Sequence, residues 1–110
     1  MDIKSEVYPE AVVLHLQGRF DFKAINTFAT ALAQAEKIHS PRRIILNLHT
    51  LTFIDSMAIG RLVGTWHKLK QDNIRLILAG QTGYINTTLT DIQLEKILPT
   101  VETVEEALTL

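Results

Sequence analysis

The sequence contains no cysteine. This absence excludes disulfide bonds, thiol catalysis and metal sites built on thiolates. It is typical of proteins that work in a reducing compartment. We therefore expect the protein to be cytoplasmic.

The chain also lacks long apolar runs and an excess of either charge. Its longest apolar runs, such as 44–46, are far shorter than the roughly 20 residues of a membrane span. The first residues, 1–6, lack the apolar core of a signal peptide. Lysine and arginine number 11 against 12 acidic residues, for a net charge of −1. We expect no direct membrane insertion, and no nucleic-acid partner because a basic footprint is missing.

Proline and glycine are few, at 3 and 5 residues, and no linker, repeat or low-complexity tract is present. The hydrophobic fraction of 46% and the charged fraction of 21% are those of an ordinary globular protein. A chain of 110 residues is long enough for one core and too short for two. We therefore interpret residues 1–110 as a single domain.

What the sequence does contain is an alternation of strand and helix patterns. Apolar and β-branched runs predict strands at 3–7, at 11–17 with Gly18 ending it, at 44–48 extending toward Asp55, at 74–79 and at about 100–101. Apolar residues at steps of three and four predict helices at 22–38, 56–71 and 84–91. Thr103, with Glu106 three residues later, predicts a capping box that begins a terminal helix.

This order predicts the fold class. Strands that alternate with helices form right-handed crossovers and a largely parallel sheet with helices packed on it. The two opening strands add an antiparallel hairpin. We therefore predict an α/β fold with a mixed, largely parallel sheet and about four α-helices.

A search for catalytic and metal-binding patterns finds none. The phosphate-binding glycine motifs, the zinc-protease histidine motif and the serine-hydrolase elbow are all missing. The four histidines share no metal-ligand spacing, and structural or surface roles account for them best. We expect His15 in a strand, His39 and His49 at the ends of elements, and His67 late in a helix. We expect a protein without enzymatic activity, cofactor or metal.

The most informative segment is 46–60, where a buried strand is followed by Asp55 and Ser56 at a helix start. Either side chain can accept hydrogen bonds from the free N–H groups of the first helical turn. One interpretation is that the pair only caps the helix. The other is that Ser56 is a phosphorylation site, since the positive helix end tolerates a phosphate while the added charge blocks a docked partner.

This segment resembles the signature of STAS domains, and in particular of bacterial anti-sigma-factor antagonists. The resemblance rests on a strand with Leu-x-Leu followed by Leu-x-Phe-apolar-Asp-Ser at a helix start, and the matching residues are Leu46, Leu48, Leu51, Phe53, Ile54, Asp55, Ser56, Ile59 and Gly60. The stretch 16–21, which ends in Asp21, and the Glu-Ala-Leu at 106–108 resemble flanking family features. Nearly the whole chain is covered.

The resemblance implies a regulatory function. Members of this kind bind an anti-sigma factor that is also a serine kinase of the GHKL type, which phosphorylates the serine and releases itself; a PP2C-type phosphatase resets the cycle. Carried over, the phosphoacceptor is Ser56, and we expect the partner-binding residues to be Asp21, Asp55, Ser56, Met57, Ala58 and Ile59.

An alternative remains open, in which the domain binds a partner without being phosphorylated. It would then be a scaffold of a stress-sensing complex or a small subunit of a lipid-transport ABC system. Met57 stands where the family has Ser or Thr, and Ala58 where it has Gly, and both differences favour this alternative. We also expect Gly60 and Gly64 to allow close packing of their helix on the sheet, and Trp66 to be buried or half-buried.

Overall fold

The computed structural model describes the backbone of residues 1–110 and all side chains except those of Ile38 and His39. The sequence-based interpretations of these two side chains therefore lie outside the described part. The strands are β1 (Asp2–Tyr8), β2 (Ala11–Phe20), β3 (Arg43–Ile54), β4 (Arg75–Ala79) and β5 (Thr100–Val101). The helices are α1 (Ile25–His39), α2 (Ser56–Gln71), α3 (Gly83–Asp91) and α4 (Val104–Leu108), with short 3₁₀ turns at Phe22–Ala24 and Leu94–Lys96.

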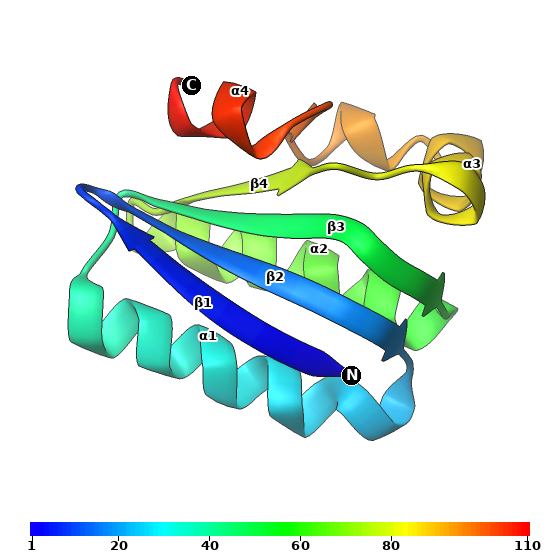
Figure 1. Ribbon diagram of the computed structural model, residues 1–110, viewed down its shortest axis with the longest axis horizontal. Coiled ribbons are helices and arrows are strands. Elements are labelled where there is room, and N and C mark those ends of the chain that lie inside the picture. The colour runs from blue at the N-terminus through cyan, green and yellow to red at the C-terminus, as the bar shows by residue number, and fades with distance from the viewer.

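The five strands form one sheet in the order β1-β2-β3-β4-β5. Strands β1 and β2 pair antiparallel as a hairpin, and every other pair is parallel. Figure 1 shows α1 and α2 on one face of the sheet and α4 on the other. The predicted mixed, largely parallel sheet with four helices is confirmed.

Two clusters of buried side chains lie on opposite faces of the sheet. In β2, Val12 and Leu14 belong to the larger cluster, which α1 and α2 cover. Val13, which alternates with them, belongs to the smaller cluster, together with Ala107 of α4. Because α4 is only 5 residues long, it covers only part of its face. Farther along β2 on the same side stands His15, whose side chain is 33% exposed.

The elements begin and end where local chemistry requires. Helix α1 ends at His39; its C-cap residue Ser40 adopts a left-handed conformation with φ of 42°, and Pro41 follows. At α4 the Thr103 hydroxyl oxygen accepts a hydrogen bond from the N–H of Glu106 at 3.1 Å. The Thr103 hydroxyl also lies 3.4 Å from the Glu106 carboxylate. The predicted helix start with this pair is therefore present.

Strand β2 differs from the sequence-based prediction, which ended it at Gly18. The strand continues to Phe20, and Gly18 has a φ of 97° that side-chain-bearing residues rarely adopt. The register with β3 shifts just after Gly18. A glycine at this place indicates a bulge inside a strand and not its end.

The glycines of α2 also differ from the expectation. Gly60 and Gly64 are exposed, and a Cβ added at either would meet nothing within 4 Å. The packing of α2 on the sheet is made by other residues, with Leu62 and Leu69 fully buried. The expectation that these glycines allow close helix–sheet contact is wrong, because both lie on the outer side of the helix.

Candidate functional site

Asp55 lies at the junction of β3 and α2 and fixes the start of the helix. Its backbone is extended, with φ of −104° and ψ of 175°, and its Oδ1 accepts a hydrogen bond from the N–H of Ala58 at 2.8 Å. Its carbonyl accepts from the N–H of Ile59 at 3.0 Å. Asp55 is thus the N-cap residue, one of the two assignments that the sequence left open.

Ser56 is the first residue of α2 and its side chain is exposed. Within the described part of the chain its hydroxyl makes no hydrogen bond, so it is not used as a cap. Met57 beside it is 59% exposed, which is unusual for a large apolar side chain. The helix start therefore presents a free hydroxyl next to an exposed thioether.

Asp21 leaves the neighbouring strand at the same edge of the sheet. Phe20 of β2 pairs with Ile54 of β3, and the N–H of Asp55 donates to the carbonyl of Phe20 at 3.3 Å. The Asp21 carboxylate accepts from the N–H of Lys23 at 3.1 Å. The backbone thus places Asp21 and Asp55 side by side as the two residues that follow β2 and β3.

One of the expected partner-binding residues, Ala58, cannot contribute an exposed side chain, and Ile59 is half-buried, as Asp21 and Asp55 are. Ala58 is 0% exposed, and its part in the site is the N–H that it gives to Asp55. Ile59 is half-buried and packs against the larger core. The exposed part of the expected set is therefore Ser56 and Met57, with Asp21 and Asp55 beside them.

A stack of three side chains at this edge was not found from the sequence. The guanidinium of Arg19 lies 4.0 Å from the centre of the Phe53 ring, and the Tyr84 ring stacks on Phe53 at 6.2 Å. Arg19 also lies 3.7 Å from the Asp21 carboxylate. Tyr84 is 53% exposed. No motif signals this stack, because its members come from β2, β3 and α3 and meet only in the fold.

Phe22 adds a further exposed aromatic ring next to Asp21. Its side chain is 62% exposed, although the helical period of the sequence places it at the start of an amphipathic helix. Phe22, Met57 and Tyr84 all follow the carboxyl ends of parallel strands. We call these three residues, with Ser56, the Ser56 face. It is apolar, exposed and adjacent to two carboxylates, which suits contact with another protein.

The shape of β3 before this site depends on a bulge. His15 pairs with Asn47 but Gln17 pairs with Thr50, so β3 has one extra residue here. The N–H of His49 donates to Oδ1 of Asn47 at 3.1 Å. A Cβ added to Gly80, whose φ is 75°, would lie 2.6 Å from the same oxygen. His49 therefore lies inside strand β3. The sequence-based expectation that it lies at the end of an element is wrong.

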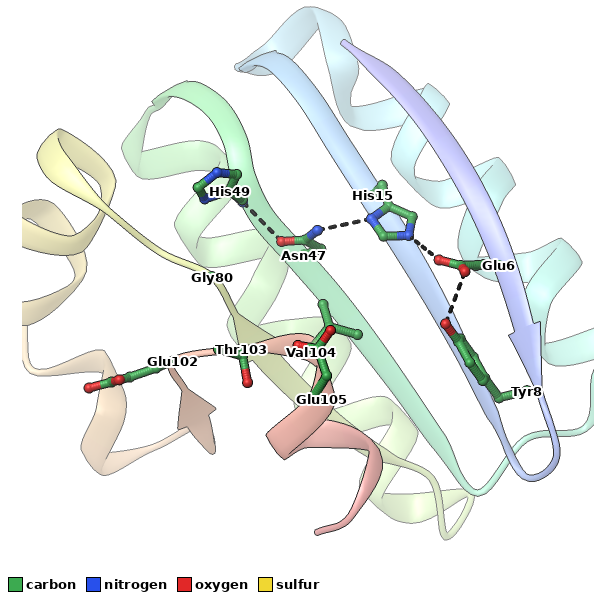
Figure 2. A pocket seen from close by; sticks show the side chains of 10 residues that line it. All are labelled: Glu6, Tyr8, His15, Asn47, His49, Gly80, Glu102, Thr103, Val104 and Glu105. Atoms are coloured by element: carbon green, nitrogen blue, oxygen red, sulfur yellow. Dashed lines mark hydrogen bonds and ion pairs between the residues drawn. The ribbon is translucent and has the colours of Figure 1, made fainter.

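Figure 2 shows that this bulge joins a chain of hydrogen bonds along the uncovered part of the sheet. Because Oδ1 of Asn47 is an acceptor, its Nδ2 donates to Nδ1 of His15 at 2.9 Å, and Nε2 of His15 donates to Glu6 at 2.7 Å. Tyr8 donates to the other Glu6 oxygen at 2.9 Å. The hydrogen bond from His15, and after it that from Tyr8, lowers the pKa of Glu6 from its usual value. The Glu6 carboxylate in turn raises the pKa of Tyr8.

Among the side chains that the structure describes, no group of three His, Asp or Glu residues could hold a metal ion. In the same part of the chain, no helix combines the length and the apolar character needed to cross a bilayer. What the Ser56 face offers is a contact surface and a hydroxyl group.

Comparison with known proteins agrees with this description. A family model of the STAS domain matches residues 2–107. A STAS-domain containing protein of Pseudomonas aeruginosa (strain UCBPP-PA14) is 31% identical over 70 residues, which are 64% of this chain and 67% of the relative.

Solved structures of anti-sigma-factor antagonists have the same fold. SpoIIAA in its unphosphorylated form is 24% identical with a TM-score of 0.75, over 98% of this chain and 94% of that one. The phosphorylated form of the Bacillus cell-fate determinant SpoIIAA is 26% identical with a TM-score of 0.72, over 98% and 97%. An antagonist from Mycobacterium paratuberculosis is 19% identical with a TM-score of 0.85, over 98% and 91%. The chain, matched by the family model over nearly its whole length, belongs to the STAS domain family.

Proposed function

We propose that this STAS domain is a regulatory protein like the anti-sigma-factor antagonists, and that it binds a serine kinase of the GHKL type that is also an anti-sigma factor. Phosphorylation of Ser56 by that kinase switches the interaction off. The observation that carries the proposal is the exposed Ser56 hydroxyl at the first position of α2, next to an exposed Met57.

The helix start can accept a phosphate without loss of the fold. The cap made by Asp55 uses the N–H groups of Ala58 and Ile59, which leaves those of Ser56 and Met57 for another acceptor. The positive end of a helix dipole favours an anion by roughly 0.3–1 kcal/mol. Among the side chains that the structure describes, none is hydrogen-bonded to the Ser56 hydroxyl, so its modification breaks no such bond.

The same phosphate changes the surface for a partner. It adds about −1.5 to −2 charges next to Asp55, and Asp21 lies beside Asp55. The local charge of the Ser56 face then becomes strongly negative while the exposed rings of Phe22 and Tyr84 stay unchanged. A partner that buries this face must desolvate the phosphate, so its affinity falls.

An alternative is a STAS domain that binds its partner without phosphorylation. The observation in its favour is the complete burial of Ala58, which rigidifies the helix start, together with the exposed Met57, an adaptable contact residue. In that case the domain is itself a scaffold of a stress-sensing complex or a small subunit of a lipid-transport ABC system. Its Ser56 face then binds a partner protein, and a negative charge at Ser56 leaves that binding nearly unchanged.

Two measurements test the proposal. Incubation with a GHKL-type kinase and ATP, followed by mass spectrometry, should place phosphate on Ser56; a chain that never acquires phosphate there contradicts the switch. Ser56→Asp should weaken kinase binding by at least about tenfold, equivalent to about 1.4 kcal/mol. Ser5→Asp, on the exposed face of β1, is the matched control and should leave binding unchanged.

A further inference from the structure

A second surface with docking character lies at the other end of α2. Residues of α2, of β4 and of the segment before β5 enclose a groove of about 270 Å³. Its walls are apolar and are formed by Trp66, Ile74, Leu76, Ile97 and Pro99. We call it the β4 groove. Figure 1 shows how α2 runs beneath β4, so that its last turns reach this side of the sheet.

The groove is apolar but not closed. Ile97 is 46% exposed, and Trp66 is half-buried, whereas Leu76 at the base is 1% exposed. Strand β5 pairs only with Leu78 and Ala79, so the first half of β4 has no strand beyond it. The groove is therefore the part of this edge that no element of the described chain covers.

Its rim carries only positive charge. Lys70 and Arg75 line the groove, and no acidic residue does. Among the described side chains neither forms an ion pair, because the ion pairs involve other residues. The ammonium of Lys70 instead lies 5.0 Å from the centre of the Trp66 ring. Within the described part of the chain, neither cation is therefore neutralised by a carboxylate, and both can pair with carboxylates of another molecule.

We propose that the β4 groove is a docking site for a segment of a partner protein that places a large apolar side chain between Trp66 and Ile97 and acidic side chains on Lys70 and Arg75. The apolar walls supply the burial, and the two cations fix the sign of charge of the partner. This surface is separate from the Ser56 face, so the inference does not depend on the phosphorylation switch.

Two other occupants fit the groove less well. A second copy related by twofold symmetry would place the same patch against itself and bring Lys70 and Arg75 of both copies together. The groove is also smaller than the roughly 300–1,000 Å³ of sites for drug-sized ligands, and it is open at Ile97. One or two side chains of a protein segment match its size.

The test uses the full chain labelled with ¹⁵N and two short capped peptides. One alternates leucine with aspartate, and the other alternates leucine with lysine. We expect the aspartate peptide to shift the Trp66 indole signal and the amide signals of Leu76 and Ile97. The lysine peptide should leave these signals in place. The absence of shifts, or equal shifts with both peptides, would overturn the proposal.

Two exposed isoleucines provide a matched pair of variants. Ile97→Asp, in the groove wall, should weaken binding of the aspartate peptide by at least about tenfold. Ile92 is 48% exposed and does not line the groove, so Ile92→Asp should change affinity by less than about twofold. Lys70→Gln keeps the apolar walls and should also weaken the aspartate peptide. Equal effects of the two isoleucine variants would refute the assigned location.

A titration with a small molecule distinguishes a protein segment from a small amphipathic ligand as the occupant of the β4 groove. Octanoate offers an apolar body and a carboxylate without a peptide backbone. Saturation of the Trp66 and Leu76 signals at lower concentrations of octanoate than of the aspartate peptide would mean that the groove binds a small amphipathic anion, and would overturn protein docking. Weaker binding of octanoate supports the proposal. Ser56→Asp should leave all these titrations unchanged, which keeps this test independent of the phosphorylation test.

Discussion

At the scale of single residues, Asp55 and Ser56 have different roles at the start of α2: one side chain caps the helix and the other is exposed. The two side chains were equal candidates for the cap in the sequence. In the structure the Asp55 carboxylate accepts the hydrogen bond from the N–H of Ala58, whereas the Ser56 hydroxyl accepts none from the described part of the chain. The Asp55 side chain stabilises the helix start, whereas the Ser56 hydroxyl stays accessible at the surface. Substitutions at these two positions should therefore have different consequences.

Asp55→Ala should lower the free energy of unfolding by about 1 kcal/mol, within the range of roughly 0.5–2 kcal/mol found for lost N-caps. The reason is that the N–H of Ala58, inside a fully buried residue, loses its acceptor. Urea denaturation followed by circular dichroism measures the change. Asp55→Asn keeps an acceptor oxygen and should lose much less, while Ser56→Ala should be nearly neutral. A loss on Ser56→Ala as large as that of Asp55→Ala would contradict the assignment.

At the scale of elements, α2 carries both proposed surfaces and is less stable than its packing allows. Gly60 and Gly64 are interior positions of this helix, and both face open solvent. Glycine in a helix interior costs about 0.8–1.0 kcal/mol relative to alanine because it loses more backbone entropy on folding. A Cβ at either position would meet none of the described atoms within 4 Å, so no close contact requires glycine there.

Gly64→Ala should therefore raise the free energy of unfolding by close to 1 kcal/mol. The added methyl group meets nothing within 4 Å, and the backbone is already helical. Gly83→Ala is the informative control. That site is equally open, but its φ of 53° is unfavourable for alanine, so this change should give no gain and a net loss. Thermal unfolding of both variants, compared with the wild type, distinguishes a backbone effect from a general effect of added volume.

Element by element, the sequence predicted the fold well where the signal was local. The range of α2, 56–71, follows from its apolar period and its cap, and both are properties of one segment. The predicted end of β2 was wrong because a glycine inside a bulge and a glycine at a strand end give the same sequence pattern. Only the pairing with the partner strand distinguishes them. Phe53 and Tyr84 are 31 positions apart in the sequence, so their stacking could not be read from any local pattern. The predicted packing of Gly60 and Gly64 on the sheet was wrong because the side of α2 that faces the sheet also depends on distant parts of the chain.

At the scale of the whole molecule, the two cores are joined by shared strands. Neighbouring residues of β2 and β3 point alternately to the α1–α2 side and to the α4 side, so neither core can form without these strands. The carbonyl of Leu110, at the end of the chain, also accepts a hydrogen bond from Arg43 of β3 at 2.7 Å. From these links we expect the chain to unfold as one cooperative unit.

Unfolding in urea should therefore be a single two-state transition. Fluorescence of Trp66, the only tryptophan, reports on α2 and β4, and far-ultraviolet circular dichroism reports on all elements. We expect the two signals to change at the same urea concentration. A Trp66 transition clearly before that of the backbone signal would mean that the α2–β4 side unfolds on its own.

The cap at Asp55 and the ring of Trp66 belong to one uninterrupted rod. Helix α2 has 16 residues and therefore spans about 24 Å at 1.5 Å per residue. The Ser56 face and the β4 groove share no residue, and Ser56 lies ten positions before Trp66 on this helix. If both proposals hold, a kinase released from the Ser56 face leaves a partner at the β4 groove in place. The domain then exchanges one companion while it stays tethered to another.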